Sequence, residues 1–104
     1  MKKITEFEKL VYAATKKIPR GRVSTYQEIA RAIGKPKSAR AVGNALGKNP
    51  FAPKVPCHRV VKSTGEVGGF LNGTFEKMKL LKKEGVLNLG GRVVSLDHKL
   101  YVFR

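Results

Sequence analysis

The chain has 104 residues, 41% of them hydrophobic, which allows one small core and predicts a single domain spanning residues 1–104. Its 22 Lys and Arg against 7 Asp and Glu give a net charge of +15, which favours a polyanionic partner, and nucleic acid is the commonest one. One cysteine excludes an internal disulfide, and one cysteine with two histidines argues against a structural zinc site, so we expect no metal and no cofactor.

The first predicted element is a helix near the N-terminus. Thr5-Glu6-Phe7-Glu8 has the form of a capping box, which marks a helix start. Apolar residues then recur at helical spacing as far as Ile18, and Pro19 and Gly21 end the pattern. This helix is expected to bury one stripe and to carry charge on its back.

Two further helices form a helix-turn-helix candidate. Ser24-Thr25-Tyr26-Gln27 is a second capping signature for a helix that ends at Gly34, and a third helix is predicted from Ser38 to Gly47. The third helix has an apolar side and a side that is basic or small, with Arg40, Ala41, Gly43 and Asn44. No acidic residue occurs from Ile29 to Gly65, which favours DNA binding, although an αα-hairpin with a solvated charged face would share the pattern.

The rest of the chain reads as loops and short elements. The prolines of Asn49–Pro56 exclude helix and central strand, Val60-Val61 suits a short extended segment, and residues 63–73 are Gly-rich. A helix is predicted from Thr74 to Gly85 with Phe75, Met78 and Leu81 in the core. Residues 92–104 suggest a weak hairpin with Asp97-His98 as turn residues. The fold class is therefore mainly α with short strands.

Cys57 is the residue whose surroundings suggest chemistry. It lies inside the basic block, between Pro56 and His58-Arg59. Positive charge favours the thiolate, which is the reactive form, and His58 is a candidate base or proton relay. The alternative is that Cys57 is a small buried hydrophobic residue without a chemical role.

These motifs resemble a known family. Pro56-Cys57-His58-Arg59-Val60 resembles the active-site signature of the O6-alkylguanine-DNA alkyltransferases. Further collinear matches run from about Phe7 to Gly85, and they are Ser24–Ala30, Ala39–Ala45, Asn49-Pro50, Gly65–Gly69 and Lys79–Gly85. The resemblance implies a winged-helix-like helix-turn-helix domain that reverses alkylation damage in double-stranded DNA and acts once, because an S-alkylcysteine is a stable product.

The resemblance also implies roles for individual residues. Cys57 would take the alkyl group from guanine O6, or from thymine O4. His58 would accept the thiol proton through a water, Glu84 would orient His58, and Asn49 would brace the active-site loop. Tyr26 would help to rotate the nucleotide outward, and Arg40 would fill the gap in the base stack, with the third helix in the minor groove.

Two sets of supporting residues follow from the same resemblance. The expected DNA contacts, besides Tyr26 and Arg40, are Ser24, Thr25, Ala39, Ala41, Gly43 and Asn44. The expected lining of the base pocket is Val55, Pro56, Val60, Ser63, Thr64, Val67, Gly68 and Phe70.

The chain departs from the family in two ways. Typical members carry an additional N-terminal domain, so this chain is expected to be the catalytic domain alone. Phe70 stands where the family usually has a tyrosine, which removes a hydroxyl near guanine O6. Both features fit an alternative, the alkyltransferase-like proteins, which bind alkylated lesions without repairing them and recruit excision repair. Those proteins lack the cysteine, whereas this chain has it.

A third interpretation is a helix-turn-helix regulator that binds a chosen DNA sequence. Such a regulator usually needs a dimer interface, and none is evident, so a monomer is expected. No apolar run is long enough to span a membrane, and the N-terminus lacks the apolar core of a signal peptide. The sequence therefore predicts a cytoplasmic protein associated with the nucleoid.

Overall fold

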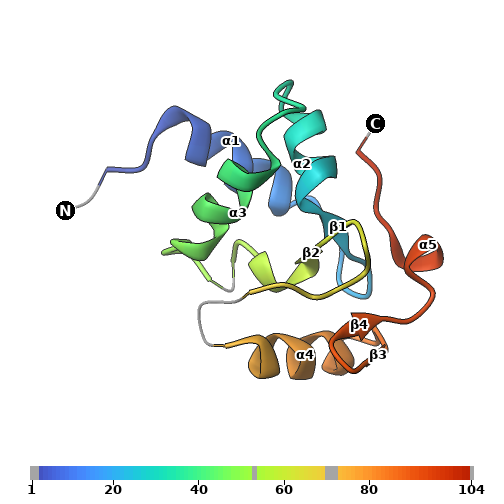
Figure 1. Ribbon diagram of the computed structural model, residues 1–104. Coiled ribbons are helices and arrows are strands. Elements are labelled where there is room, and N and C mark those ends of the chain that lie inside the picture. Colours follow the sequence, from blue (N-terminus) through green and yellow to red (C-terminus); the bar gives the residue numbers. More distant parts are fainter. Residues whose placement is uncertain (1–2, 53, 70–72, 104) are drawn as a thin grey trace.

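The computed structural model describes residues 3–52, 54–69 and 73–103. Helices dominate and the strands are short, as the sequence predicts (Figure 1). In chain order the elements are α1 (Glu6–Thr15), β1 (Ser24–Thr25), α2 (Tyr26–Ala32), α3 (Ala39–Gly47), η1 (Cys57–Arg59), β2 (Val60–Val61), α4 (Thr74–Lys83), β3 (Asn88–Leu89), β4 (Arg92–Val93) and α5 (Leu96–Lys99). The longest of these helices have 10 residues, and none in the described part of the chain could cross a bilayer.

Helix α1 begins where its capping box predicts. The Thr5 side chain accepts from the Glu8 amide, and the Glu8 carboxylate accepts from the Thr5 amide in return. The α-helix ends at Thr15, before Pro19, and two turn hydrogen bonds carry the chain onward to Ile18. Ile18 stays buried with the helix, so the apolar stripe outlasts the regular helix.

Helices α2 and α3 form the predicted helix-turn-helix and pack directly against each other. The cap of α2 is Thr25, whose hydroxyl accepts from the Glu28 amide, so the helix begins one residue later than a Ser24 cap would place it. Gly34 ends α2 with a φ of 77°, a value that glycine adopts without strain. Residues Val42, Ala45 and Leu46 of α3 are buried.

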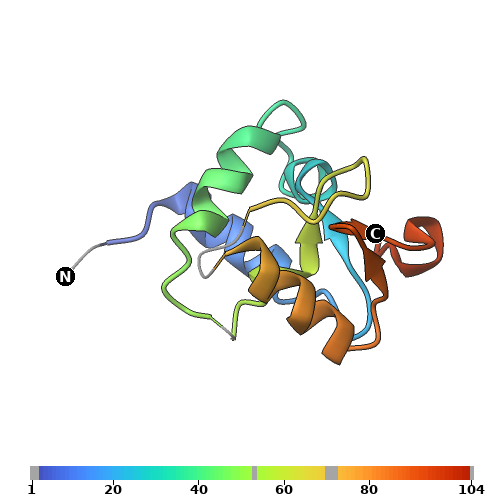
Figure 2. The ribbon, with the colours of Figure 1, turned by 60° about the horizontal axis from the view of Figure 1, so that its bottom comes forward.

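The two parallel strands β1 and β2 separate two small cores (Figure 1). Helices α1, α2 and α3 enclose the larger core on one side. On the other side, α4 and the β3–β4 hairpin enclose a smaller one made of Val23, Val61, Val67, Leu81, Val86 and Val93. Figure 2 shows α4 running past the segment that contains η1, and the two elements are in contact. The cysteine turn η1 therefore lies between the two halves.

Helix α4 differs from the sequence prediction at one of its three expected core residues. Phe75 was expected in the core, but it is 74% exposed. Leu81 is buried as predicted, and Lys77 and Glu84 share its inward helix face at the spacing i, i+4, i+7. Met78 packs against the smaller core as expected. The helix thus buries Lys77, which the hydrophobic pattern did not predict, and exposes Phe75, which the pattern placed in the core.

The C-terminal segment also differs from its prediction. The hairpin pairs Asn88 with Val93 around Gly90-Gly91, which have φ values of 57° and 80° and suit a tight hairpin turn. Asp97 and His98, expected in a turn between strands, lie in the short helix α5. The hairpin thus begins before residue 92, and the Gly-Gly pair was the signal for it.

Candidate functional site

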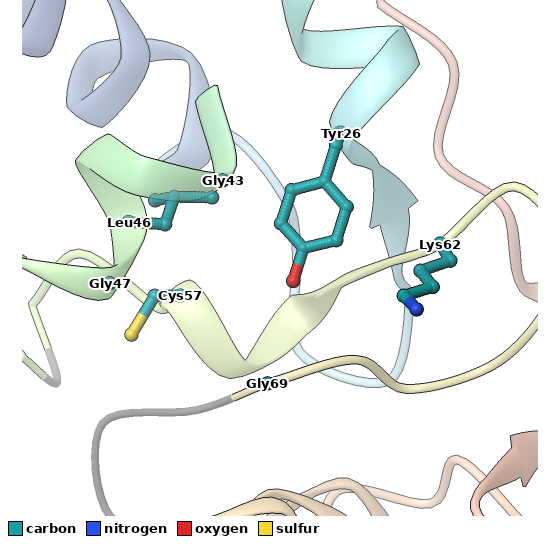
Figure 3. Close-up of a pocket in the computed structure, with 7 residues that line it drawn as sticks. All are labelled: Tyr26, Gly43, Leu46, Gly47, Cys57, Lys62 and Gly69. Atoms are coloured by element: carbon teal, nitrogen blue, oxygen red, sulfur yellow. The ribbon is translucent and has the colours of Figure 1, made fainter. Parts of the chain in front are cut away.

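A cavity of about 350 Å³ opens between the helix-turn-helix and the loop that follows β2. Its volume lies within the range of small-molecule sites. Figure 3 shows Tyr26 entering from the start of α2, Cys57 at the start of η1, and Gly69 on the loop. The other lining residues are Gly43, Leu46, Gly47 and Lys62. Of the predicted site residues, the structure brings Tyr26, Gly43 and Cys57 together in this cavity.

Cys57 is held in place by a network of backbone hydrogen bonds. It is 6% exposed, and its amide donates to the Val55 carbonyl at 2.8 Å. Asn49, itself buried, donates from Nδ2 to the same carbonyl at 2.8 Å and accepts from the Phe51 amide at 2.9 Å. These contacts fix the proline-rich loop that delivers the thiol. Asn49 thus has the geometry that a bracing role requires.

Behind Cys57 lies a triad of His58, Arg59 and Glu84. The Glu84 carboxylate accepts two hydrogen bonds from Arg59, at 2.9 and 2.8 Å, and Arg59 also donates to the Ile18 carbonyl at 2.8 Å. His58 Nε2 lies 3.0 Å from Glu84 Oε1. Within the described residues, however, Nε2 has no hydrogen-bond partner of good geometry. Glu84 is therefore oriented chiefly by Arg59, and its close approach to His58 is not a well-formed hydrogen bond.

The triad shifts the pKa values of its members. Burial lowers the pKa of His58, and the nearby Glu84 carboxylate opposes this without reversing it. Burial alone would raise the pKa of Glu84, but the hydrogen bonds of Arg59 and the nearby His58 outweigh it, so the pKa is lowered. At neutral pH the imidazole is therefore neutral and able to accept a proton, while the carboxylate is ionised.

Lys77 is a site residue that the sequence analysis missed. It is 1% exposed, and its Nζ donates to the Tyr26 hydroxyl and to the Gly69 carbonyl, both at 3.2 Å. Burial lowers the pKa of Lys77 to about 8, although the charge of Cys57 opposes this. Burial, with the charge of Cys57 adding to it, raises the pKa of Tyr26. Lys77 thus ties two walls of the cavity together. Its helical spacing with Leu81 and Glu84 was the available signal.

A second cavity adjoins the first along the start of α3. Tyr26, Gly43 and Lys62 line both cavities, and the second adds Gln27, Ala39, Arg40 and Ser63. Arg40, Ala41 and Asn44 are exposed on α3. The two cavities are continuous with one face of the helix-turn-helix, which suits a ligand that reaches from the surface to Cys57. Leu46, Gly47, Lys62 and Gly69 were not among the predicted lining residues.

Several predicted contacts need correction. Ser24 is fully buried and its hydroxyl donates to the Tyr101 carbonyl, while Thr25 is 5% exposed and caps α2, so neither hydroxyl is open to DNA. The Val55 carbonyl already accepts two hydrogen bonds, which leaves it no lone pair for a base. The Thr64 carbonyl accepts one hydrogen bond, from Arg92 at 2.7 Å, which leaves it one lone pair.

The remaining pocket residues are placed as follows. The side chains of Val60 and Val67 belong to the two cores, and the buried Pro56 precedes η1. Gly68 has a φ of 78°, and a β-carbon there would come within 3.0 Å of the Tyr26 hydroxyl. Phe70 lies outside the described residues. The described residues hold no cluster of three or more His, Cys, Asp or Glu side chains that could bind a metal ion.

The comparisons with known proteins point to one family. The family model described as 6-O-methylguanine DNA methyltransferase, DNA binding domain, matches residues 6–86. A methylated-DNA–protein-cysteine methyltransferase of Methanosarcina acetivorans is 52% identical over 81 residues, which are 78% of this chain and 52% of that protein. The chain spans about half the length of the curated relatives that it matches.

Solved structures agree. Mycobacterium tuberculosis OGT, crystallised in complex with DNA, has a TM-score of 0.78 and 44% identity, covering 80% of this chain and 51% of that one. S. pombe Atl1, in complex with damaged DNA containing O6-carboxymethylguanine, has a TM-score of 0.81 and 33% identity, covering 96% of this chain and 98% of that one. The chain therefore belongs to the family of the 6-O-methylguanine DNA methyltransferase DNA-binding domain.

Proposed function

We propose that this protein repairs DNA by taking an alkyl group from guanine O6 and keeping it on Cys57. The observation that carries the proposal is a buried thiol at the wall of a cavity whose mouth is continuous with a basic helix-turn-helix face. An alkyl carbon inside a stacked duplex is out of reach, so the base must leave the stack and enter such a cavity.

In the proposed reaction the Cys57 sulfur attacks the alkyl carbon. A carbon–sulfur bond forms as the carbon–O6 bond breaks, and the electron pair stays with the guanine. The thiol proton passes to His58, which is neutral at physiological pH because burial lowers its pKa, and then to the guanine. The products are an S-alkylcysteine and an unmodified guanine. The S-alkylcysteine is a thioether, which does not give up its alkyl group at neutral pH, so each molecule acts once.

DNA is the proposed partner, and α3 is the proposed contact. Arg40 is exposed beside the cavity mouth, where it could enter the base stack in place of the extruded nucleotide. The side chains around Arg40 on α3 are small, at Ala39, Ala41 and Gly43, which allows the helix to approach a DNA groove closely. Several known relatives and structural neighbours are named for methylated DNA or were solved with DNA, which supports this choice.

The second candidate is a lesion sensor that binds alkylated DNA without repairing it. It is favoured by one observation, the match with S. pombe Atl1 over nearly the whole of both chains. Cys57 opposes it, because a sensor needs no thiol at the cavity wall.

Intact-protein mass measurement separates the two candidates. The protein is incubated with a duplex that contains one O6-methylguanine and, separately, with the unmodified duplex. Repair predicts the added mass of one methyl group on Cys57 with the first duplex only, and none with the Cys57→Ser variant. Selective binding of the alkylated duplex without any mass gain would favour the sensor instead.

A further inference from the structure

The hairpin β3–β4 lies beyond the family match, which ends at residue 86. It does not line the cavity, yet it pairs with the loop that does. The Val67 amide donates to the Gly91 carbonyl, and the Val93 amide donates to the Gly65 carbonyl, both at 2.8 Å. Glu66 and Arg92 face each other in an antiparallel bridge. The hairpin thus adds strands to one edge of residues 65–67.

A side chain strengthens this pairing. Arg92 Nη1 donates to the Thr64 carbonyl at 2.7 Å, and a β-carbon on Gly65 would lie 3.5 Å from Arg92 Cγ. Val67 and Val93 are both buried in the smaller core, so the contact is apolar on its inner side. The loop is therefore held at its outer edge by hydrogen bonds and underneath by packing.

The held segment leads directly into the cavity. Val67 is anchored in the smaller core, Gly68 lies against the Tyr26 hydroxyl, and Gly69 lines the cavity while its carbonyl accepts from Lys77. A displacement of Val67 would therefore also move Gly69, which lies two residues later and lines the cavity. Since Gly65 and Gly68 both have positive φ values, the loop has little intrinsic preference for this path and depends on outside contacts.

We propose that the β3–β4 hairpin, through Arg92, is a positioning element that sets how selectively the cavity holds an alkylated guanine, a role that rests on the proposed function. A wall that is held in place before the base enters loses less conformational entropy on binding, so the affinity for the extruded base rises. The residues of the hairpin do not line either cavity, so we expect Arg92 to affect the binding of an extruded base more than the binding of undamaged DNA. Its effect is therefore on the ratio between the two affinities.

The test compares Arg92→Ala with a matched control, Arg22→Ala. Arg22 is also an exposed arginine that donates to backbone carbonyls of the C-terminal segment, those of Lys99 and Leu100, but it does not touch the loop. Both variants lose one positive charge. Dissociation constants are measured in a Cys57→Ser background, so that the lesion is not repaired during the measurement, for a duplex with one O6-methylguanine and for the unmodified duplex, alongside amide hydrogen exchange of the loop.

Arg92→Ala is expected to lower the selectivity for the alkylated duplex about fivefold, because it removes one hydrogen bond. It should also speed amide hydrogen exchange at Val67. Arg22→Ala should leave both unchanged, and Arg92→Lys should restore part of the selectivity. Equal selectivity in Arg92→Ala and Arg22→Ala would overturn the proposal. If the Cys57→Ser parent shows no selectivity, the proposed function fails, and unchanged exchange at Val67 in Arg92→Ala would then separately overturn the hairpin's role.

Discussion

The two walls of the Cys57 cavity are built differently. The wall from α2 and α3 rests on the larger apolar core, and its exposed face carries Arg40 and Asn44. The opposite wall, residues 62–69, rests on the smaller core and is held by long polar ties, from Lys77 to Gly69 and from Arg92 to Thr64. The first wall resembles a rigid scaffold, whereas the second depends on single side chains.

Because of this difference, substitutions in the two walls should affect folding stability and the selectivity for alkylated DNA to different extents. Apolar cores tolerate the loss of an exposed side chain, so changes on the α3 face should alter DNA affinity and leave folding intact. Buried hydrogen bonds such as those of Lys77 should affect both stability and selectivity, because removing one partner leaves the other buried without a hydrogen bond. The following predictions test that division, from the largest expected effect to the smallest.

The proton relay should show the largest effect. We expect His58→Gln to slow alkyl transfer about 1,000-fold, within the usual range for a lost general base. In the wild-type protein, burial lowers the pKa of His58 below its ordinary 6.5, so the neutral ring persists as the pH falls to that value. Transfer should stay level from pH 8 to 6.5 and decline only at lower pH. Single-turnover rates across this range check the profile, and a decline centred above pH 7 would contradict it.

Glu84→Gln should break the triad behind the thiol. It leaves the guanidinium of Arg59, which is only 17% exposed, without its charged partner. The expected loss is about 3 kcal/mol of unfolding free energy, as for other buried ion pairs that lose one member. Urea unfolding at pH 7 measures it. The exposed pair of Lys9 and Glu6 supplies the control, since Glu6→Gln should change stability little. Equal effects of the two variants would refute a buried triad.

Lys77→Met should change both the rate of transfer and the pH dependence of stability. Loss of the shared donor to Tyr26 and Gly69 is expected to slow transfer about 20-fold, as for a lost charged hydrogen bond. Folding lowers the pKa of Lys77 from 10.5 to about 8, so between these values the unfolded chain binds more protons. The stability of the wild type relative to Lys77→Met should therefore rise with pH from 8 to 10.5. A flat or falling difference in unfolding free energy would contradict the buried ammonium.

Arg40→Ala should affect DNA alone. We expect about a tenfold weaker affinity for an alkylated duplex, with an unchanged melting temperature. A duplex that already carries an extrahelical base needs less help to open, so the loss there should be smaller. Arg31→Ala, an exposed arginine of α2 paired with Glu28, is the matched control. Equal losses on the two duplexes would make Arg40 an ordinary phosphate contact.

Phe75→Ser should have the smallest effect. Because Phe75 is 74% exposed, its replacement should change the unfolding free energy by less than about 0.5 kcal/mol. Met78→Ala, three residues on and packed on the smaller core, should cost about 2 kcal/mol. A larger loss at Phe75 than at Met78 would contradict the exposed position of Phe75 on α4.

Local signals predicted the first wall well and the second poorly. The cap of α1, the glycine that ends α2 and the apolar stripe of α3 are short-range features, and each was visible in the sequence. The corrections concern residues whose partners are distant in sequence. Lys77 meets Tyr26 across 51 positions and Arg92 meets Thr64 across 28, so helical spacing could place Lys77 on the inward face of α4 but could not identify either partner. Ser24 was misassigned for the same reason, because its hydroxyl binds the Tyr101 carbonyl.

In the candidate site, too, the sequence indicated the residue types but not the long-range hydrogen bonds. The motif around Cys57 indicated the thiol and its neighbouring histidine, and the family resemblance implied Glu84 beside His58 and a bracing role for Asn49. It did not indicate that Arg59, rather than His58, holds the Glu84 carboxylate through two hydrogen bonds. A motif records which residue types recur, whereas the hydrogen-bond geometry depends on how α4 packs against η1.

One measurement tests most directly the central claim, which is that the alkyl group is transferred irreversibly to Cys57. A duplex containing O6-methylguanine is mixed with an excess of the protein, and restored guanine and S-methylcysteine are quantified after complete digestion of each. The account predicts one S-methylcysteine, at Cys57, for every guanine restored, and no further repair when fresh duplex is added to fully methylated protein. Restored guanine without a methylated Cys57, or continued repair by the methylated protein, would contradict it.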